Sequence, residues 1–147
     1  MSTHSISKFR ISLFAAVLAL APIAHGQDVG MTGKINVPFA FKTATGQHFN
    51  AGVYTIQMEN VHTLQIKGQS ISGLVMTTIE DNAQPSKTGK ATFRKYGAQY
   101  FLSDIVIAGK SRRLSLLPPK MARRLQVAAG QTATPAPVEL ALLGTTR

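Results

Sequence analysis

Apolar and polar residues alternate along most of the chain after residue 33, which is the pattern of β-strands that bury one face. In residues 34–42, Ile35, Val37, Phe39 and Phe41 point to one side. Pro38 lies within this run and cannot donate a ladder hydrogen bond, so we expect an edge strand or a bulge there. Glycine, asparagine and proline turns separate the further predicted strands, at residues 53–59, 62–67, 71–80, 91–95, 99–108 and 114–117.

The pattern changes after Pro118-Pro119, where helical spacing replaces alternation. Met121, Leu125 and Ala128 recur on one side, opposite Lys120, Arg123 and Arg124, and Gly130 is placed to end the helix. We therefore predict one amphipathic helix of about ten residues. Strands at close spacing with short turns and one late helix predict an all-β fold, an antiparallel β-sandwich or small barrel with one short C-terminal helix.

The segment after this helix is expected to be a flexible tail, residues 131–147. Residues 132–137 (TATPAP) have the composition of a linker. Residues 138–143 are apolar enough either to dock as a strand or to stay loose. The predicted β-domain therefore comprises residues 27–130.

The first 26 residues have the three parts of a secretory signal peptide. Lys8 and Arg10 give a positive start, residues 11–21 form an apolar run, and Ala24-His25-Gly26 supplies small residues for cleavage before Gln27. A helix of that run spans roughly 16 Å, about half of a bilayer core. We expect a periplasmic or secreted protein with no transmembrane span after processing.

The net charge of the whole chain is +10, and removal of Lys8 and Arg10 would leave +8. A basic protein often binds nucleic acid, but export argues against that partner and favours anionic lipid or glycan of the envelope. We therefore expect no nucleic-acid binding. A charge of this size can also serve solubility alone. The chain has no cysteine, which excludes disulfides and zinc–thiolate sites.

Five basic residues near the predicted helix form the candidate anion-binding site: Arg112, Arg113, Lys120, Arg123 and Arg124. They lie beside apolar residues, a combination suited to an anionic membrane surface or glycolipid. The alternative is a helix that docks its apolar side on the sheet and leaves its arginines in water.

Four aromatic residues could line a pocket for an apolar ligand inside the sheet: Phe39, Phe41, Tyr54 and Phe101. A small carrier protein is therefore an alternative function, and simple core packing is the other explanation of these rings. Asp104 interrupts an apolar strand on the face predicted to hold Tyr100, Leu102 and Val106, and we expect it to form a salt bridge.

The sequence offers little for catalysis. Beyond the signal segment the histidines are His48 and His62, in a turn and at a strand start, without metal-ligand spacing. A hydrolase using either one is a weak alternative. We expect no enzyme activity, no metal and no cofactor.

Three short motifs occur in order: Val37-Pro38-Phe39-Ala40-Phe41, then Ala51-Gly52-Val53-Tyr54, then Tyr96-Gly97 with Tyr100-Phe101-Leu102. As a set they resemble small uncharacterised exported β-domain proteins that are common in acidobacterial genomes. The resemblance covers residues 33–125 and implies export and a β-rich fold. It implies no activity, so the sequence favours an exported cell-envelope protein with a binding or structural role.

Overall fold

The computed structural model of the protein describes the backbone of residues 32–81 and 84–146. The predicted signal peptide, residues 1–26, lies outside the described residues. The described part contains β1 (Thr32–Val37), β2 (Phe41–Lys42), β3 (His48–Phe49), β4 (Gly52–Asn60), β5 (Thr63–Lys67), β6 (Ser72–Met76), β7 (Thr78–Glu80), β8 (Lys90–Tyr96), β9 (Gln99–Val106), β10 (Arg113–Ser115), α1 (Pro119–Ala128), β11 (Pro137–Ala141) and β12 (Leu143–Thr146).

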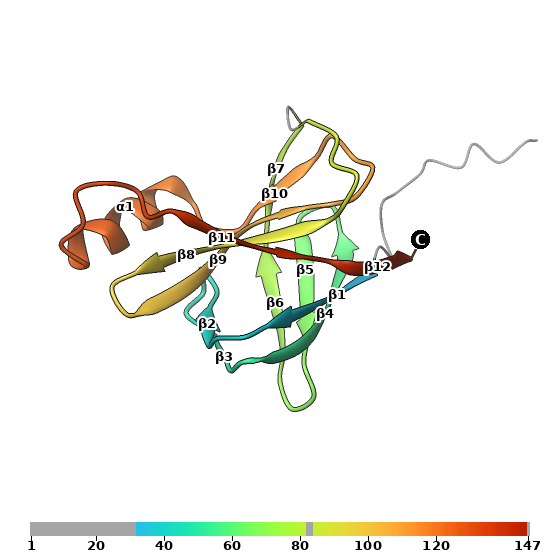
Figure 1. The fold of residues 1–147 in the computed structure, drawn as a ribbon, viewed down its shortest axis with the longest axis horizontal. Helices are drawn as coiled ribbons and strands as arrows, with labels where there is room; N and C mark the ends of the chain where they lie inside the picture. The colour runs from blue at the N-terminus through green and yellow to red at the C-terminus, as the bar shows by residue number, and fades with distance from the viewer. Residues whose placement is uncertain (1–31, 82–83, 147) are drawn as a thin grey trace, which may run out of the picture.

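The strands form two sheets that enclose one core (Figure 1). Sheet A has the order β12-β1-β4-β5-β6, and all of its pairings are antiparallel. Sheet B has the order β11-β8-β9-β10-β7, with β2 and β3 added beside the start of β9. The pairing of β2 with β9 is parallel. The prediction of an all-β sandwich with one short helix is confirmed.

The chain passes directly from one sheet to the other at three corners. Pro38, which lacks an N–H, follows β1, and the predicted strand of residues 34–42 divides there into β1 and β2. At the second corner Thr77 separates β6 from β7 and donates its N–H to His62 O at 2.9 Å. At the third, Leu142 separates β11 from β12. Corners of this kind join stacked sheets into one barrel-like unit.

The core between the sheets is made by the alternating positions that the sequence predicts. Ile35 and Val37 of β1 are buried, as are Leu64 and Ile66 of β5. Aromatic rings fill one end of this core, where Phe41 stacks on Phe49 at 5.0 Å and Tyr54 meets both rings edge-on. Burial of such side chains contributes roughly 1.5–3 kcal/mol each.

A β-bulge in β9 changes which side chains face this core. Thr92 of β8 pairs with Asp104, but the next residue, Phe93, pairs with Leu102, so Ser103 is an extra residue in β9. Tyr100 and Leu102 therefore pack on the core, whereas Asp104 lies on the outer face of sheet B. The predicted shared face of Tyr100, Leu102 and Asp104 is wrong, because strict alternation does not survive a bulge.

The helix α1 lies over the outer face of sheet B. Its half-buried residues Met121, Ala122 and Leu125 pack on a second, smaller core of Tyr96, Phe101 and Leu117. Pro119 occupies the first turn, and Gly130, with φ +64°, follows the helix in the left-handed conformation that glycine adopts easily. The predicted ten-residue helix is present. No helix of the described residues has the length and apolar character needed to cross a membrane.

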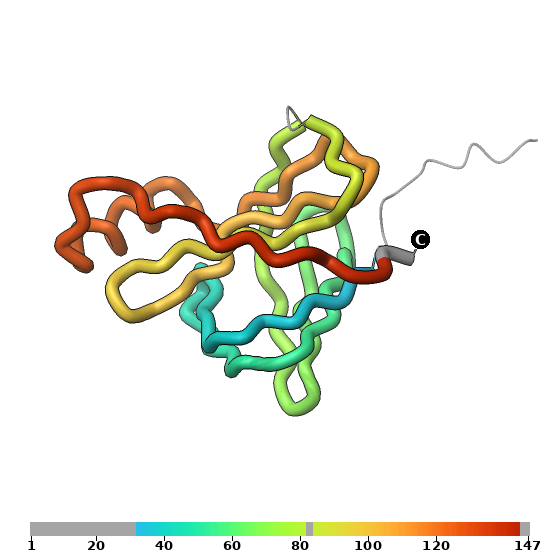
Figure 2. The backbone as a smooth tube through the Cα atoms, in the orientation of Figure 1, coloured from blue at the N-terminus to red at the C-terminus, as the bar shows by residue number. Residues whose placement is uncertain are grey.

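The segment predicted to be a flexible tail contains the last two strands of the β-domain. The strand β11 pairs with β8, and β12 pairs with β1. Figure 2 shows the chain crossing the molecule from α1 to the beginning of β1, where β12 lies beside Thr32 and Lys34. The prediction that the β-domain ends at Gly130 is therefore wrong, because residues 137–146 form strands of its two sheets. Val138 and Leu140 pack against the core and β8 would otherwise be an open edge, which explains the docking.

Candidate anion-binding surface

The outward side of α1 gathers three of the five basic residues predicted to bind anions. Lys120, Arg123 and Arg124 are exposed, while the opposite side of the helix packs on Phe101 and its neighbours. The helix sequence PKMARRLQVA contains no acidic residue. The geometry therefore presents three cations together, with no carboxylate on their own element to neutralise them.

An apolar surface lies among these cations. Lys120, Arg123, Arg124, Val127 and Ala128 line an open hollow of about 540 Å³. Val127 is 75% exposed and adds an apolar side chain to this group. We name these five residues the α1 surface. A mixed basic and apolar surface of this kind suits a ligand with an anionic group beside an apolar part.

The position of Val127 in the sequence indicates its place on this face of the helix. Positions 120, 123, 124 and 127 follow the i, i+3, i+4, i+7 spacing of one helix face. The helical spacing predicts Ala128 on the docking side, but Ala128 is exposed and lines the hollow. Ala122 and Ala129 pack on the second core instead. The rotation of the helix about its axis depends on the sheet beneath it.

The other two predicted residues lie apart from the α1 surface. Arg112 forms an ion pair with Asp81, with Nε 3.1 Å from Oδ1. Arg113 pairs with Val106 at the end of β9, whereas α1 lies over Phe101 near the start of that strand. The five basic residues therefore form two groups.

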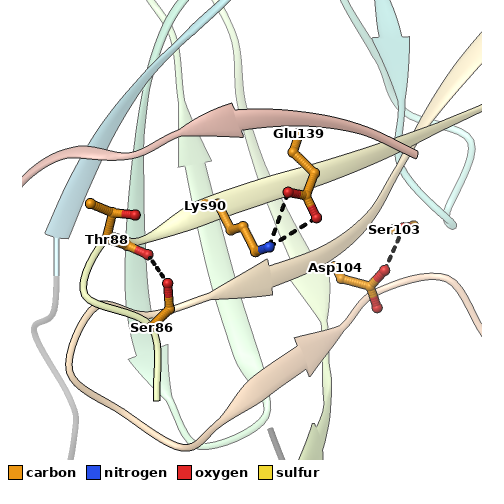
Figure 3. A network of polar contacts seen from close by, with 6 residues as sticks. All are labelled: Ser86, Thr88, Lys90, Ser103, Asp104 and Glu139. Atoms are coloured by element: carbon orange, nitrogen blue, oxygen red, sulfur yellow. Dashed lines mark hydrogen bonds and ion pairs between the residues drawn. The ribbon is translucent and has the colours of Figure 1, made fainter. Parts of the chain in front are cut away.

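Arg113 belongs to a polar region on the outer face of sheet B. It lines a hollow of about 500 Å³ with Glu80, Ser86 and Lys90. Figure 3 shows Lys90 Nζ between the two carboxylate oxygens of Glu139, at 2.9 and 3.0 Å. With acidic and basic groups already paired there, this region is a weaker anion site than the α1 surface.

Asp104 also lies in this region. It accepts a hydrogen bond from Ser103 Oγ at 2.6 Å (Figure 3), whereas the sequence predicts a salt bridge. Lys90–Glu139 and Arg112–Asp81 are ion pairs within the described residues, and neither includes Asp104. Since the bulge turns Asp104 outward, its carboxylate is partly solvated and needs no cation.

The four aromatic residues predicted to line a pocket do not lie together. Phe41 and Tyr54 belong to the main core, with centroids 5.4 Å apart, and Phe39 stacks on Tyr100 at 4.0 Å. Phe101 packs with Tyr96 on the opposite face of sheet B, under α1. The predicted pocket is therefore wrong as a single site, because the bulge in β9 places Phe101 outside the main core.

The two histidines lie near opposite ends of β4. His48 lines an open hollow of about 490 Å³ with Asn50, Tyr54 and Gln69, next to the start of the strand. His62 lies in the turn after it, so the nine residues of β4 separate the two histidines. Both are exposed. In residues 32–81 and 84–146, no three His, Asp or Glu side chains gather as metal ligands would.

These observations define the class of protein: a small two-sheet β-domain that carries a basic helix on the outside of one sheet. Comparisons with protein-family models, with curated proteins and with solved structures found no match for this chain.

Proposed function

We propose that the protein is an exported, non-enzymatic binding protein of the cell envelope and that the α1 surface binds an anionic lipid or glycan. One observation carries this proposal. Lys120, Arg123 and Arg124 are exposed around Val127 on a helix without acidic residues. Positive charge and exposed apolar area therefore lie together on the outer side of α1.

The charged and apolar groups of the α1 surface favour binding to the anionic surface of a membrane. Each Lys or Arg near an anionic surface contributes about 1 kcal/mol, and this contribution falls within a Debye length. The two guanidinium groups can also bind phosphate or carboxylate with paired hydrogen bonds. Val127 would add apolar contact with acyl chains, so an anionic lipid is the ligand that uses every part of the surface.

Two features of the sequence support the location in the envelope. The segment 1–26 has the order of charges, apolar run and small residues that signal peptidases recognise. The remaining chain would keep a net charge of +8 in a compartment where lipid headgroups and acidic glycans are the abundant polyanions.

The first test measures co-sedimentation with phosphatidylcholine vesicles that contain or lack phosphatidylglycerol, at low and moderate salt. We expect binding only to the anionic vesicles, weakening as salt rises because the attraction is screened. Equal binding to vesicles with and without phosphatidylglycerol would contradict the proposal. No binding to either vesicle, with binding to an acidic polysaccharide such as polygalacturonate, would identify a glycan ligand.

The second test assigns the binding to α1. The variant Lys120→Gln/Arg123→Gln/Arg124→Gln should lose more than about tenfold in affinity, since about 1 kcal/mol is lost per cation. The matched control Lys34→Gln/Lys67→Gln/Lys87→Gln removes the same charge from exposed positions elsewhere and should bind almost normally. If the control weakens binding as much, net charge alone drives the association and α1 has no special role.

A further inference from the structure

The strand β6 forms a free edge of sheet A. It pairs with β5 and ends the order β12-β1-β4-β5-β6, as Figure 1 shows. Residues 68–79, which include β6, contain no charged residue and no proline. Natural proteins usually protect such edges with lysine, proline or a covering element. By contrast, the sheet B edge strand β11 carries Pro137 and Glu139.

The hydrogen-bond pattern shows which backbone groups of β6 face away from β5. Gly68 N bonds to Ile71 O, and Thr77 N bonds to His62 O, so odd-numbered residues of this strand bond to β5. The amides of Ser72, Leu74 and Met76 consequently point toward the open edge. Gln47 Nε2 already bonds to Ser72 O at 3.0 Å, which closes the edge at Ser72 and leaves Leu74 and Met76 available.

The same two residues carry exposed apolar side chains. Leu74 is 58% exposed and Met76 is 77% exposed, on the outer face of sheet A. Val61, in the turn between β4 and β5, is also an exposed apolar residue. A free ladder and exposed apolar side chains thus coincide at Leu74 and Met76, the combination that favours addition of another strand.

We propose that β6 pairs antiparallel with β6 of a second copy of this chain, with Leu74 opposite Met76 of the other copy. The two-fold arrangement repeats this pair, so both outward amides in each strand gain partners and the two A sheets become continuous. The arrangement buries Leu74 of each copy against Met76 of the other.

The absence of charge in residues 68–79 permits a second copy as the occupant of this edge. A chain of net charge +10, or +8 after processing, repels another copy over most of its surface. The edge formed by β6 and its flanks opposes no like charges when it meets itself. The residues are also self-complementary in this register, because the leucine and the methionine are each other's partner. The interface is small, so we expect a weak dimer that forms only as the protein concentration rises.

Sedimentation velocity over a wide concentration range measures the association. We expect a reversible monomer–dimer equilibrium that L74K shifts toward monomer by more than tenfold in dissociation constant. The control V53K adds the same charge on the same sheet face, at a residue that is 59% exposed but lies on the interior strand β4. V53K should dimerise like the unchanged protein. A protein that stays monomeric throughout, or equal losses in both variants, would overturn edge pairing.

Two further measurements test the register. Amide exchange should slow at Leu74 and Met76 as concentration rises, while Val75, already bonded within the monomer ladder, changes little. The chain has no cysteine, so an introduced thiol is unique. Mild oxidation of mixed L74C and M76C variants should give the mixed disulfide in preference to either homodimer. Preferential L74C homodimers would contradict this register. Association through a strand other than β6 would leave the amides of Leu74 and Met76 unprotected and would overturn the proposal.

Discussion

At the residue scale, the hydroxyl groups of two buried tyrosines have opposite effects on the stability of the fold. Tyr54 donates its hydroxyl hydrogen to Asn50 O. Tyr96 is 5% exposed, and its buried hydroxyl has no hydrogen-bond partner within the described residues. A buried hydroxyl that loses its hydrogen bonds to water destabilises the folded state by about 1–3 kcal/mol. The two rings therefore form a matched pair for mutation.

Tyr96→Phe is expected to raise the free energy of unfolding by about 1 kcal/mol, because it removes the unpartnered hydroxyl and keeps the ring on Phe101. Tyr54→Phe, the control, should lower it by about 1 kcal/mol through loss of the bond to Asn50. Urea unfolding of both variants gives the comparison. A loss of stability in Tyr96→Phe would show that its hydroxyl has a favourable partner in solution.

Tyr96 and Tyr54 also make the free energy of unfolding depend on pH. Burial raises the pKa of Tyr96 above its ordinary value of 10.0; the nearby Asp104 adds to the rise and Arg94 opposes it. Burial also raises the pKa of Tyr54. An unfolded chain releases these protons near pH 10 while the folded chain keeps them, so stability falls as pH rises above 10. Tyr96→Phe should show a shallower fall in urea titrations, and an unchanged slope would contradict this assignment.

At the scale of elements, Ser103 shows how one residue decides what both faces of a sheet contain. Its extra position in β9 sends Leu102 into the main core and Phe101 under α1. Its carbonyl also accepts hydrogen bonds from Leu116 N at 2.7 Å and Leu117 N at 3.3 Å. The bulge thus positions the helix as well as the strand, and the α1 surface depends on it.

Deletion of Ser103 is expected to abolish the fold or lower its stability by more than about 3 kcal/mol, since the chain on one side of the deletion must turn its side chains to the wrong face. Ser103→Ala keeps the extra residue and loses only the hydroxyl bond to Asp104, so it should cost about 1 kcal/mol. Thermal unfolding of the two variants separates the outcomes. Similar stabilities would show that the register can adjust without the bulge.

At the scale of the whole molecule, the end of the chain holds the two sheets together. The strand β11 completes sheet B, β12 completes sheet A, and Leu142 between them bonds its N–H to Gly89 O at 2.8 Å. The linker before them is also anchored, because Arg94 Nη1 donates to Pro135 O at 3.1 Å. One continuous segment therefore spans from α1 across both sheets.

A chain ended after Gly130 should lose roughly 3–5 kcal/mol of stability, or fail to fold, because β8 and β1 lose their neighbouring strands and core residues lose cover. Urea unfolding compared with the full chain provides the measurement. A truncation within β12, after Leu143, is the milder comparison. If removal of residues 131–147 left stability unchanged, these strands would contribute nothing in solution.

The sequence by itself determined the local elements. Alternation along residues 34–37 and 63–67 specifies strands and their buried faces, and the spacing of Lys120, Arg123 and Arg124 specifies one basic side of a helix. Such patterns are local because each side chain's direction follows from its neighbours in the chain. The class of fold and three members of the candidate site could therefore be predicted.

Only the tertiary structure decided which elements meet. It turned residues 34–42 at a corner, inserted Ser103 as a bulge, and paired β11 and β12 with strands far away in sequence. It also separated Arg112 and Arg113 from α1 and left the edge of β6 open. These outcomes depend on hydrogen bonds and packing between distant segments, whose energies no local pattern contains.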